Sequence, residues 1–275
     1  MTIWDCGESL CEAFAACLES PSSDWIGNLR VGVDLGTANV VVAVVDSANR
    51  PVAGRLRPAQ VVRDGIVVDF CRARDIVDSM VRDLEAELGV ELRIAACAVP
   101  PGTRPGDCRA TQYVVEGAGL EVLAVVDEPS AAARVLGITD GAVVDIGGGT
   151  TGISVLKDGK VIYTADEPTG GTHFTLVIAG AYGLSFEEAE RLKIDPGRQR
   201  ELFPILRPVM EKVAAIIANH IASFDIDHIY LVGGASALSG LQDVVTSHVG
   251  VSASVPRHPL LVTPLGIALM CPDTA

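Results

Sequence analysis

Two aspartates stand at the ends of apolar runs, and each is followed at once by a glycine-rich turn. Asp34 precedes the turn at residues 35–39, and Asp145 precedes the turn at residues 146–151. The backbone N–H groups of such turns converge on an anion, and glycine leaves room for phosphate oxygens where a Cβ would block them. A hard cation such as Mg²⁺ prefers oxygen ligands and keeps much of its water, so the two carboxylates would hold it partly through water. The pair predicts a metal–polyphosphate site between two similar halves of the chain.

The residues expected to contact the phosphates are the small and polar members of the two turns. Glycines allow close approach of the backbone, and the threonines and the asparagine add side-chain donors. These residues are Gly36, Thr37, Ala38 and Asn39 in the first turn, and Gly147, Gly148, Gly149, Thr150 and Thr151 in the second. The alternative is that each aspartate only caps its turn. The same order occurs twice, with a strand, Asp-aliphatic-Gly, a second strand and a hairpin, and it indicates an internal duplication.

Hydrophobic periodicity places strands on both sides of these turns and helices between them. Apolar runs predict strands at residues 29–34, 40–45, 94–99, 120–126, 142–146 and 229–232. Helical spacing and end signals predict helices over the first twenty residues, over 73–88, after Pro129, from about Thr172, after Ser185, over 201–223 and over 265–270. Ser185 and Glu188 form a capping box, and we expect Pro204 and Pro208 to be tolerated only near the start of their helix. The alternation of strands and helices predicts an α/β fold.

Composition narrows the classes of function. Hydrophobic residues make up 49% of the chain and aromatic residues 4%, so the core must consist mainly of Val, Ile, Leu and Ala. The net charge of −14 argues against binding to nucleic acid or to an anionic membrane. The N-terminus lacks a basic leader, and no segment approaches the roughly 20 apolar residues of a membrane span. Seven cysteines without a CxxC pair indicate free, mostly buried thiols in a reducing cytosol, so we expect a cytoplasmic protein.

Five segments, in the expected order, resemble the motifs of the actin, DnaK and sugar-kinase superfamily of ATPases. Residues 33–37 are similar to its first phosphate motif, and residues 145–151 are similar to its second. Residues 231–236 resemble its adenosine motif, and residues 127–133 resemble its connecting helix. Residues 170–174 resemble the Gly-Gly-x-x-Phe segment that precedes an interface helix.

The resemblance implies ATP or ADP with Mg²⁺ as cofactors, and it assigns roles to individual residues. Glu128 would orient the attacking water, with Asp34 and Asp145 completing the catalytic set at the metal; the alternative is that Glu128 only caps its helix. Glu190 and Lys193 fall where the superfamily contacts adenine and ribose, although the same spacing suits a surface ion pair. The other implied nucleotide contacts are Gly170, Gly171, Gly233, Gly234, Ala235 and Ser236.

The resemblance also implies two ribonuclease-H-like lobes, each with a mixed five-stranded sheet flanked by helices, and a nucleotide cleft between them. We expect an N-terminal helical segment at 1–27, a first lobe at 28–139 that regains the C-terminal helix 258–275, and a second lobe at 140–257. The N-terminal helix could dock a partner or cover its own core. The oligomeric state is left open.

Within the superfamily, residues 62–70, 127–129, 144–152 and 165–171 resemble the EutJ-like proteins of ethanolamine utilization. That resemblance implies a chaperone-like or assembly factor in which the nucleotide controls lobe closure. Its client would be a component of ethanolamine utilization or of a bacterial microcompartment, met in the cytoplasm or at the microcompartment. Two alternatives stay open. One is an actin-like filament or scaffold protein. The other is a small-molecule kinase, although such kinases usually carry larger insertions that form the acceptor pocket, and this chain is close to the core fold alone.

Two departures from the superfamily pattern limit the expected catalysis. DnaK-type ATPases use a lysine from an inserted subdomain of the first lobe, whereas this chain has no lysine before Lys157 and only a short connection between Asp46 and Arg63. Leu260 stands where an adenosine-side aspartate is expected. Phosphoryl transfer depends on cations near the γ-phosphate, so we expect slow or absent hydrolysis.

Overall fold

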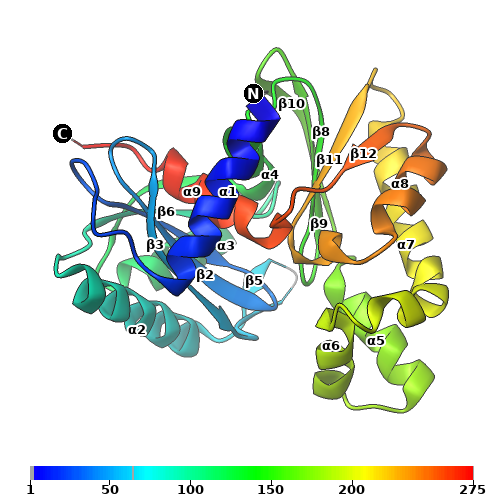
Figure 1. The fold of residues 1–275 in the computed structure, drawn as a ribbon, viewed down its shortest axis with the longest axis horizontal. Coiled ribbons are helices and arrows are strands. Elements are labelled where there is room, and N and C mark those ends of the chain that lie inside the picture. The colour runs from blue at the N-terminus through cyan, green and yellow to red at the C-terminus, as the bar shows by residue number, and fades with distance from the viewer. Residues whose placement is uncertain (1–2, 64, 275) are drawn as a thin grey trace.

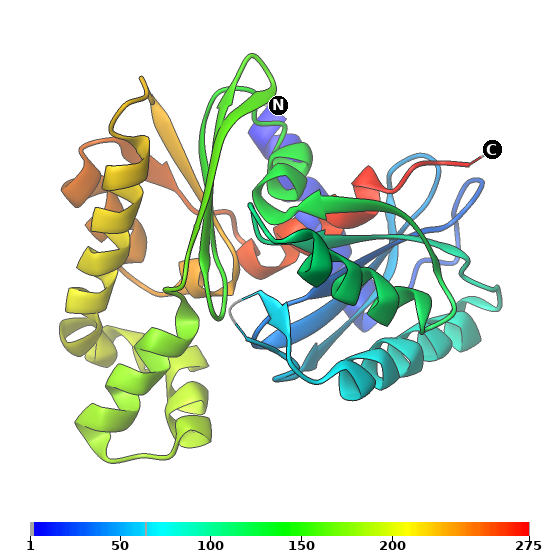
Figure 2. The ribbon, with the colours of Figure 1, turned by 180° about the vertical axis from the view of Figure 1, so that it is seen from behind.

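Two five-stranded sheets stand side by side, and helices flank each of them (Figures 1 and 2). The structure, a computed structural model, describes residues 3–63 and 65–274. In each sheet three antiparallel strands are continued by two parallel ones. This arrangement confirms the predicted α/β fold of two ribonuclease-H-like lobes with mixed sheets. Residues 1 and 2 of the predicted N-terminal segment, and residue 64 of the segment 62–70, lie outside the described residues.

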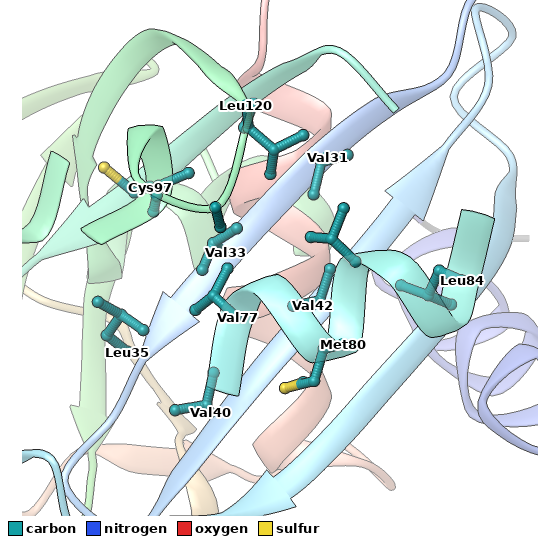
Figure 3. Packing of buried hydrophobic residues seen from close by; sticks show 14 of the residues in the cluster. Val31, Val33, Leu35, Val40, Val42, Val77, Met80, Leu84, Cys97 and Leu120 are labelled. Atoms are coloured by element: carbon teal, nitrogen blue, oxygen red, sulfur yellow. The ribbon is translucent and has the colours of Figure 1, made fainter. Parts of the chain in front are cut away.

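The first sheet has the strand order β3-β2-β1-β6-β7. Its strands are β1 (Arg30–Leu35), β2 (Asn39–Val45), β3 (Pro51–Pro58), β6 (Ile94–Val99) and β7 (Glu121–Asp127). Its other elements are the hairpin strands β4 (Val62–Arg63) and β5 (Ile66–Val67) and the helices α2 (Phe70–Leu88) and α3 (Pro105–Glu116). The apolar stripe of α2, which includes Val77 and Met80, packs against Val33 and Val42 of the sheet (Figure 3).

The second sheet repeats this order as β10-β9-β8-β11-β12, so each strand of the first sheet has a counterpart in the second. Its strands are β8 (Gly141–Ile146), β9 (Thr151–Lys157), β10 (Lys160–Glu167), β11 (His228–Val232) and β12 (Ser252–Ser254). Its helices are α5 (Gly171–Tyr182), α6 (Phe186–Ile194), α7 (Gln199–Ile221), the 3₁₀ turn η1 (Gly234–Ala237) and α8 (Leu241–Val249). The repeated strand order matches the duplication that the two aspartate turns predict.

Two helices, α4 (Glu128–Leu136) and α9 (Pro259–Met270), lie between the sheets and pack against each other. A Cβ on Gly266 of α9 would lie 1.9 Å from the carbonyl oxygen of Ala131 in α4, so this crossing requires glycine. α9 follows the second sheet in the chain, yet it packs on β1 of the first, where a Cβ on Gly32 would lie 2.3 Å from the backbone nitrogen of Ala268. α9 therefore connects the two halves, whose boundaries remain predictions.

The first helix, α1 (Ile3–Glu19), lies on its own core and contacts β3, α4 and α9. Phe14 is fully buried and packs beside Gly54 of β3. The ring of Trp4 lies 5.4 Å from that of Tyr230 in β11. Glu12 also forms a 3.0 Å ion pair with Arg257, which precedes α9. Of the two roles predicted for this helix, these contacts support the covering of its own core.

Two helices of the first lobe differ from the helices that the sequence predicts. α2 begins at Phe70 rather than at residue 73, because the Asp69 side chain accepts a 3.1 Å hydrogen bond from the Arg72 backbone N–H and caps the helix. α3 has no counterpart among the predicted helices. It follows a loop rich in proline and glycine and buries only a short set of residues, Thr111, Val114 and Val115.

The prolines of α7 correct one expectation. Pro204 and Pro208 both lie inside the helix, and since α7 begins at Gln199, the prediction that both lie near its start is wrong for Pro208. Both prolines are exposed, so the carbonyl groups that lose a helical partner can bond to water instead. The last helix also begins earlier than residue 265, at Pro259, where proline suits the first helical position.

The seven cysteines are free thiols, as predicted. The buried ones are Cys11, Cys17, Cys97 and Cys271. Among the helices within residues 3–63 and 65–274, none is long and apolar enough to cross a membrane.

Candidate functional site

Both glycine-rich turns line one cavity between the sheets. Its volume of about 240 Å³ is far above the roughly 10–15 Å³ that suffices for a single water, so a larger ligand can enter. The predicted site residues that line it are Asp34, Gly36, Thr37, Ala38, Asn39, Glu128, Asp145, Gly147, Gly148, Gly149, Thr150, Gly171, Glu190, Lys193, Gly233, Gly234 and Ala235. The structure does not bring the other three, Thr151, Gly170 and Ser236, to the cavity wall.

The two turns come into contact at Gly148. A Cβ on Gly148 would lie 3.1 Å from the Cβ of Ala38 and 3.2 Å from the Cβ of Thr37. A side chain at this position would therefore press against the first turn. The two turns, one from each half of the chain, face a common space.

Three carboxyl groups converge at this cavity. Burial raises the pKa of Asp34 to about 7, and the nearby charge of Asp145 adds to the effect. Burial also raises the pKa of Asp145 to about 6, although a hydrogen bond from Thr263 opposes the rise. The pKa of Glu128 lies well above its usual value, because of burial and then because of the charges of Asp145 and Asp34. Such mutual repulsion in a shielded site is relieved when a cation binds between the carboxylates.

Two neighbours fix the position of the Asp145 side chain. One of them, Gly233, is a predicted site residue, and the other, Thr263, is not. Asp145 is 6% exposed, and its Oδ2 accepts a 2.6 Å hydrogen bond from the Thr263 hydroxyl of α9. Its Oδ1 lies against Gly233, where a Cβ would come within 2.2 Å and where φ is +83°. Gly233 is thus required both by its left-handed backbone and by this close approach. Thr263 is a missed site residue whose signal is a hydroxyl within an otherwise apolar helix.

The segment at the start of α5 donates backbone hydrogen bonds to the second glycine-rich turn. The backbone N–H of Gly171 donates to the Gly147 carbonyl at 2.8 Å, and that of Thr172 donates to the Gly148 carbonyl at 2.7 Å. Gly170 fits this approach because a Cβ there would lie 2.8 Å from the Gly147 oxygen.

Two predicted contacts turn their side chains inward instead of toward the cavity. The Thr151 hydroxyl donates to the Thr169 carbonyl at 2.5 Å, and Thr151 is fully buried. The Ser236 hydroxyl donates to the Val232 carbonyl at 2.6 Å. Both residues therefore support the walls of the site rather than line it.

Lys193 and Glu190 form the ion pair that their spacing allows, but this pair is not on the surface. Lys193 is 8% exposed, and its ammonium donates to Glu190 Oε2 at 2.7 Å, to Thr175 Oγ1 at 2.9 Å and to the Gly171 carbonyl at 3.1 Å. Burial lowers the pKa of Lys193, and the Glu190 carboxylate opposes that shift. The pair joins α6 to the start of α5, next to the second glycine-rich turn.

The alternative role for Glu128, capping its helix, belongs to its neighbour. The Asp127 side chain accepts a 2.9 Å hydrogen bond from the Ser130 backbone N–H at the start of α4. Glu128 lies in the first turn and faces the cavity. Its carboxyl group is therefore free of the capping task.

Three further residues line the cavity although they are not among the predicted ligand contacts. Leu260, expected from the motif comparison to replace an aspartate, lies on the wall, and a Cβ on Gly234 would lie 3.2 Å from its Cδ1. Gln199, at the start of α7, lines the cavity and accepts a hydrogen bond from the Ser239 backbone N–H. The hairpin residue Gly65 closes another side.

The cavity suits a ligand that carries phosphate and brings its own cation. Turn N–H groups can bind an anion, whereas Lys193 is the only Lys or Arg side chain among the described lining residues. Across residues 3–63 and 65–274, no three His, Cys, Asp or Glu side chains are arranged to hold a metal by themselves. A cation here would take much of its coordination from water and from the ligand, as Mg²⁺ usually does.

Comparison with known proteins gives three levels of similarity. The chain is 45% identical over 261 residues to the ethanolamine utilization protein EutJ of Escherichia coli K12, covering 94% of this chain and 90% of that protein. The crystal structure of EutJ from Carboxydothermus hydrogenoformans superposes with a TM-score of 0.91 at 49% identity, over 96% of this chain and 97% of that one. MreB5 of Spiroplasma citri bound to ADP superposes with a TM-score of 0.70 at 17% identity, over 87% of this chain and 94% of that one, which shows a common fold.

A family model described as type IV pilus assembly protein PilM matches residues 129–259. This match covers less than half of the chain and falls mainly on the second sheet and its helices.

Proposed function

The chain belongs to the EutJ family of ethanolamine-utilization proteins, and from that premise we propose that it binds ATP with Mg²⁺ between its lobes and acts as a chaperone-like or assembly factor. One observation carries the proposal. Two glycine-rich turns, each preceded by an aspartate, meet at Gly148 and Ala38 and line one cavity. The ADP bound to MreB5 of Spiroplasma citri supports the choice of a nucleotide, because that protein has the same fold.

The residues of the cavity fit Mg-ATP by their chemistry. The second turn presents Gly147, Gly148 and Gly149, whose backbone can approach phosphate oxygens without interference from a Cβ. Asp34 and Asp145 would hold the metal partly through water. When bound, Mg²⁺ neutralises part of the phosphate charge and favours the charged form of both carboxyl groups, whose pKa values burial raises.

The far end of the cavity would hold the adenosine. Gly233 and Gly234 let the backbone lie flat against it, and Leu260 adds an apolar contact where a polar one is expected. Lys193 holds α6 against the start of α5, which in turn holds the second turn through Gly171. Hydrogen bonds therefore connect Lys193, which is expected to lie beside the adenosine, to the second glycine-rich turn, which is expected to bind the phosphates.

Hydrolysis at this site would be slow or absent. The Lys193 ammonium has three N–H donors, and all three are engaged by protein acceptors, so it offers none to a γ-phosphate. Charge stabilisation would fall to Mg²⁺ and to turn N–H groups, and Glu128 would orient the water.

ATP would control the protein through the separation of its lobes. α4 and α9 lie between the sheets, and Thr263 of α9 bonds to Asp145, which directly precedes the second turn, so a ligand between the turns acts on the elements that connect the lobes. The client would be a component of ethanolamine utilization or of its microcompartment, met in the cytoplasm or at the microcompartment surface.

A binding assay with the purified proteins of an ethanolamine-utilization system tests this function. The full chain, immobilised, should retain one or more of these proteins to a different extent with Mg-ATP than with Mg-ADP, and Asp34→Asn should retain them equally with both. Equal retention by the wild type with Mg-ATP and with Mg-ADP would contradict nucleotide control. ATP-dependent pelleting of the chain alone would instead favour a filament-forming protein.

A further inference from the structure

A surface patch beside the cavity exposes apolar side chains from three adjoining elements. Ile66 of β5 is 47% exposed, Val68 is 56% exposed, Phe70 at the start of α2 is 41% exposed and Tyr113 of α3 is 52% exposed. α3 contacts both β5 and α2, and Figure 2 shows the three elements next to one another on the side turned to the viewer. Exposed apolar side chains that gather in this way mark interaction sites more often than isolated ones do.

Four arginines belong to the same elements and their flanking loops. They are Arg63, Arg72, Arg104 and Arg109, and all four are exposed. Within the described residues, none of these side chains makes a hydrogen bond or an ion pair. The close packing of Gly65 against Pro100 brings the hairpin, and with it Arg63, next to the loop that leads to Arg104.

These unpaired arginines contrast with the other arginines of the first lobe. There, Arg55 pairs with Glu87 and Arg57 pairs with Asp83. Further pairs in the same lobe are Arg50–Asp46, Arg82–Asp78 and Arg93–Glu91. These five arginines are therefore neutralised by carboxylates, as Arg74 is by Asp75, whereas the four arginines of the patch are left available.

The local charge also differs in sign from that of the rest of the protein. Residues 62–75, which include the ion pair Arg74–Asp75, and residues 100–113 contain five Arg and four Asp, a net of +1, whereas the whole chain carries −14 and the remainder therefore −15. Of the nearby carboxylates, Asp69 accepts the hydrogen bond that caps α2. The patch is thus a locally basic, apolar area on a strongly acidic protein.

We propose that this patch, formed by Ile66, Val68, Phe70, Tyr113 and the four arginines, docks an acidic amphipathic segment of a partner protein. Arginine binds carboxylates through a planar fork of N–H donors, and the apolar side chains would accept the apolar stripe of the segment. A second copy of the chain is disfavoured because each copy carries −14. The same net charge disfavours nucleic acid and anionic membranes.

The position of the patch connects it to the proposed function, on which it rests for the existence of a client. Val62 and Gly65 of the hairpin line the cavity, while Ile66 of the same hairpin is exposed. A docked segment would therefore contact the outer side of an element whose inner side closes the nucleotide cavity.

Two labelled helical peptides of about 18 residues, or five turns, serve as probes. Both have the same leucine stripe, and the polar face carries glutamate in one and lysine in the other. Fluorescence anisotropy with the full chain should show the acidic peptide binding about tenfold or more tightly than the basic one, a difference of about 1.4 kcal/mol.

Variants of the patch identify where the acidic peptide binds. Ile66→Ser with Val68→Ser and Phe70→Ser should weaken its binding about tenfold, and Arg63→Gln with Arg104→Gln should remove most of the preference for the acidic peptide. The matched control, Leu176→Ser with Arg200→Gln, changes an exposed apolar residue and an exposed arginine of the second lobe and should leave binding unchanged.

Besides an absence of peptide binding, four outcomes would overturn the proposal. They are equal binding of the two peptides, an equal loss of binding in the control variant, self-association of the wild type that the triple serine variant removes, and tighter binding to anionic vesicles than to the acidic peptide. Mg-ATP affinity is measured on the same proteins. Nucleotide binding without peptide binding refutes the docking surface alone, and peptide binding without nucleotide binding refutes the proposed function alone.

Discussion

The Thr263 hydroxyl donates a 2.6 Å hydrogen bond to the Asp145 carboxylate, and this bond joins α9 to the end of β8, directly before the second glycine-rich turn. Asp145 lies in β8 of the second sheet, whereas α9 packs on β1 and β2 of the first. Both residues are buried, with exposed fractions of 4% for Thr263 and 6% for Asp145. A buried bond to a charged group contributes about 1.5–3 kcal/mol, enough to make the position of α9 depend on the state of this carboxylate.

Replacing Thr263 by valine should therefore destabilise the protein and weaken Mg-ATP binding. Valine keeps the shape but leaves Asp145 Oδ2 without its donor, at a cost of about 1–3 kcal/mol in the free energy of unfolding. Thr263→Ser retains the hydroxyl and should retain most of the affinity. Chemical denaturation and calorimetry of both variants check this, and a valine variant as stable and as tight-binding as the serine variant would show that the bond has no such role.

Gly233→Ala should disrupt the site more than an equally strained substitution elsewhere. The added Cβ would lie 2.2 Å from Asp145 Oδ1 at a backbone φ of +83°. Gly250, with φ +77° and no atom within 4 Å of an added Cβ, provides the matched control for backbone strain alone. Gly250→Ala should cost about 1 kcal/mol of stability and leave nucleotide affinity intact. Equal effects of the two variants would mean that crowding at Asp145 is unimportant.

The parts of the site that could be predicted are those in which a motif contains both the element and the chemistry. At the first turn, β1 is an apolar run that ends with Asp34 and Leu35, and Gly36 follows it, so one short segment predicts the strand, the turn and the carboxylate. Glu128 is similar, since the strand β7 leads directly into α4. In both cases, neighbouring residues along the chain are sufficient.

The remaining features depend on contacts between distant segments. Thr263 and Asp145 meet only because α9 returns to lie between the sheets. Thr151 appears in sequence to be as good a phosphate donor as Thr150, but it begins β9 and turns its hydroxyl to Thr169. The spacing of Glu190 and Lys193 predicts that they share one helix face, but it does not indicate that this face is buried. No local pattern contains that information.

The stability of the protein without nucleotide and metal should depend on pH through Asp34. Burial raises the pKa of Asp34 from 3.8 to about 7, so the folded state keeps a proton that the unfolded chain releases. The favourable contribution is complete below the unfolded pKa and is lost as pH rises from about 4 to about 7. In the presence of a chelator, the wild type should lose stability relative to Asp34→Asn across this window. Thermal unfolding of the two proteins in parallel checks the prediction, which a difference independent of pH would exclude.

Glu128→Gln should reduce hydrolysis and spare ATP binding. The glutamine keeps the shape of the side chain and cannot accept a proton from water, and the capping of α4 by Asp127 is unaffected. Single-turnover assays should show hydrolysis well below the common enzyme range of about 1–10³ s⁻¹ in the wild type and slower still in the variant. Brisk hydrolysis that survives the substitution would mean that another group orients the water.

Isothermal titration calorimetry measures whether Asp34 and Asp145 hold Mg-ATP between the two turns, as we propose. The titration uses the wild type, Asp34→Asn, Asp145→Asn and, as a control, Asp227→Asn, which changes an exposed aspartate in the loop before β11. We predict that Mg-ATP binds the wild type and the control alike, and binds each site variant about tenfold or more weakly. Circular dichroism should show all four proteins folded. Equal affinity in all four, or no binding to the wild type, would show that these two carboxylates do not hold Mg-ATP.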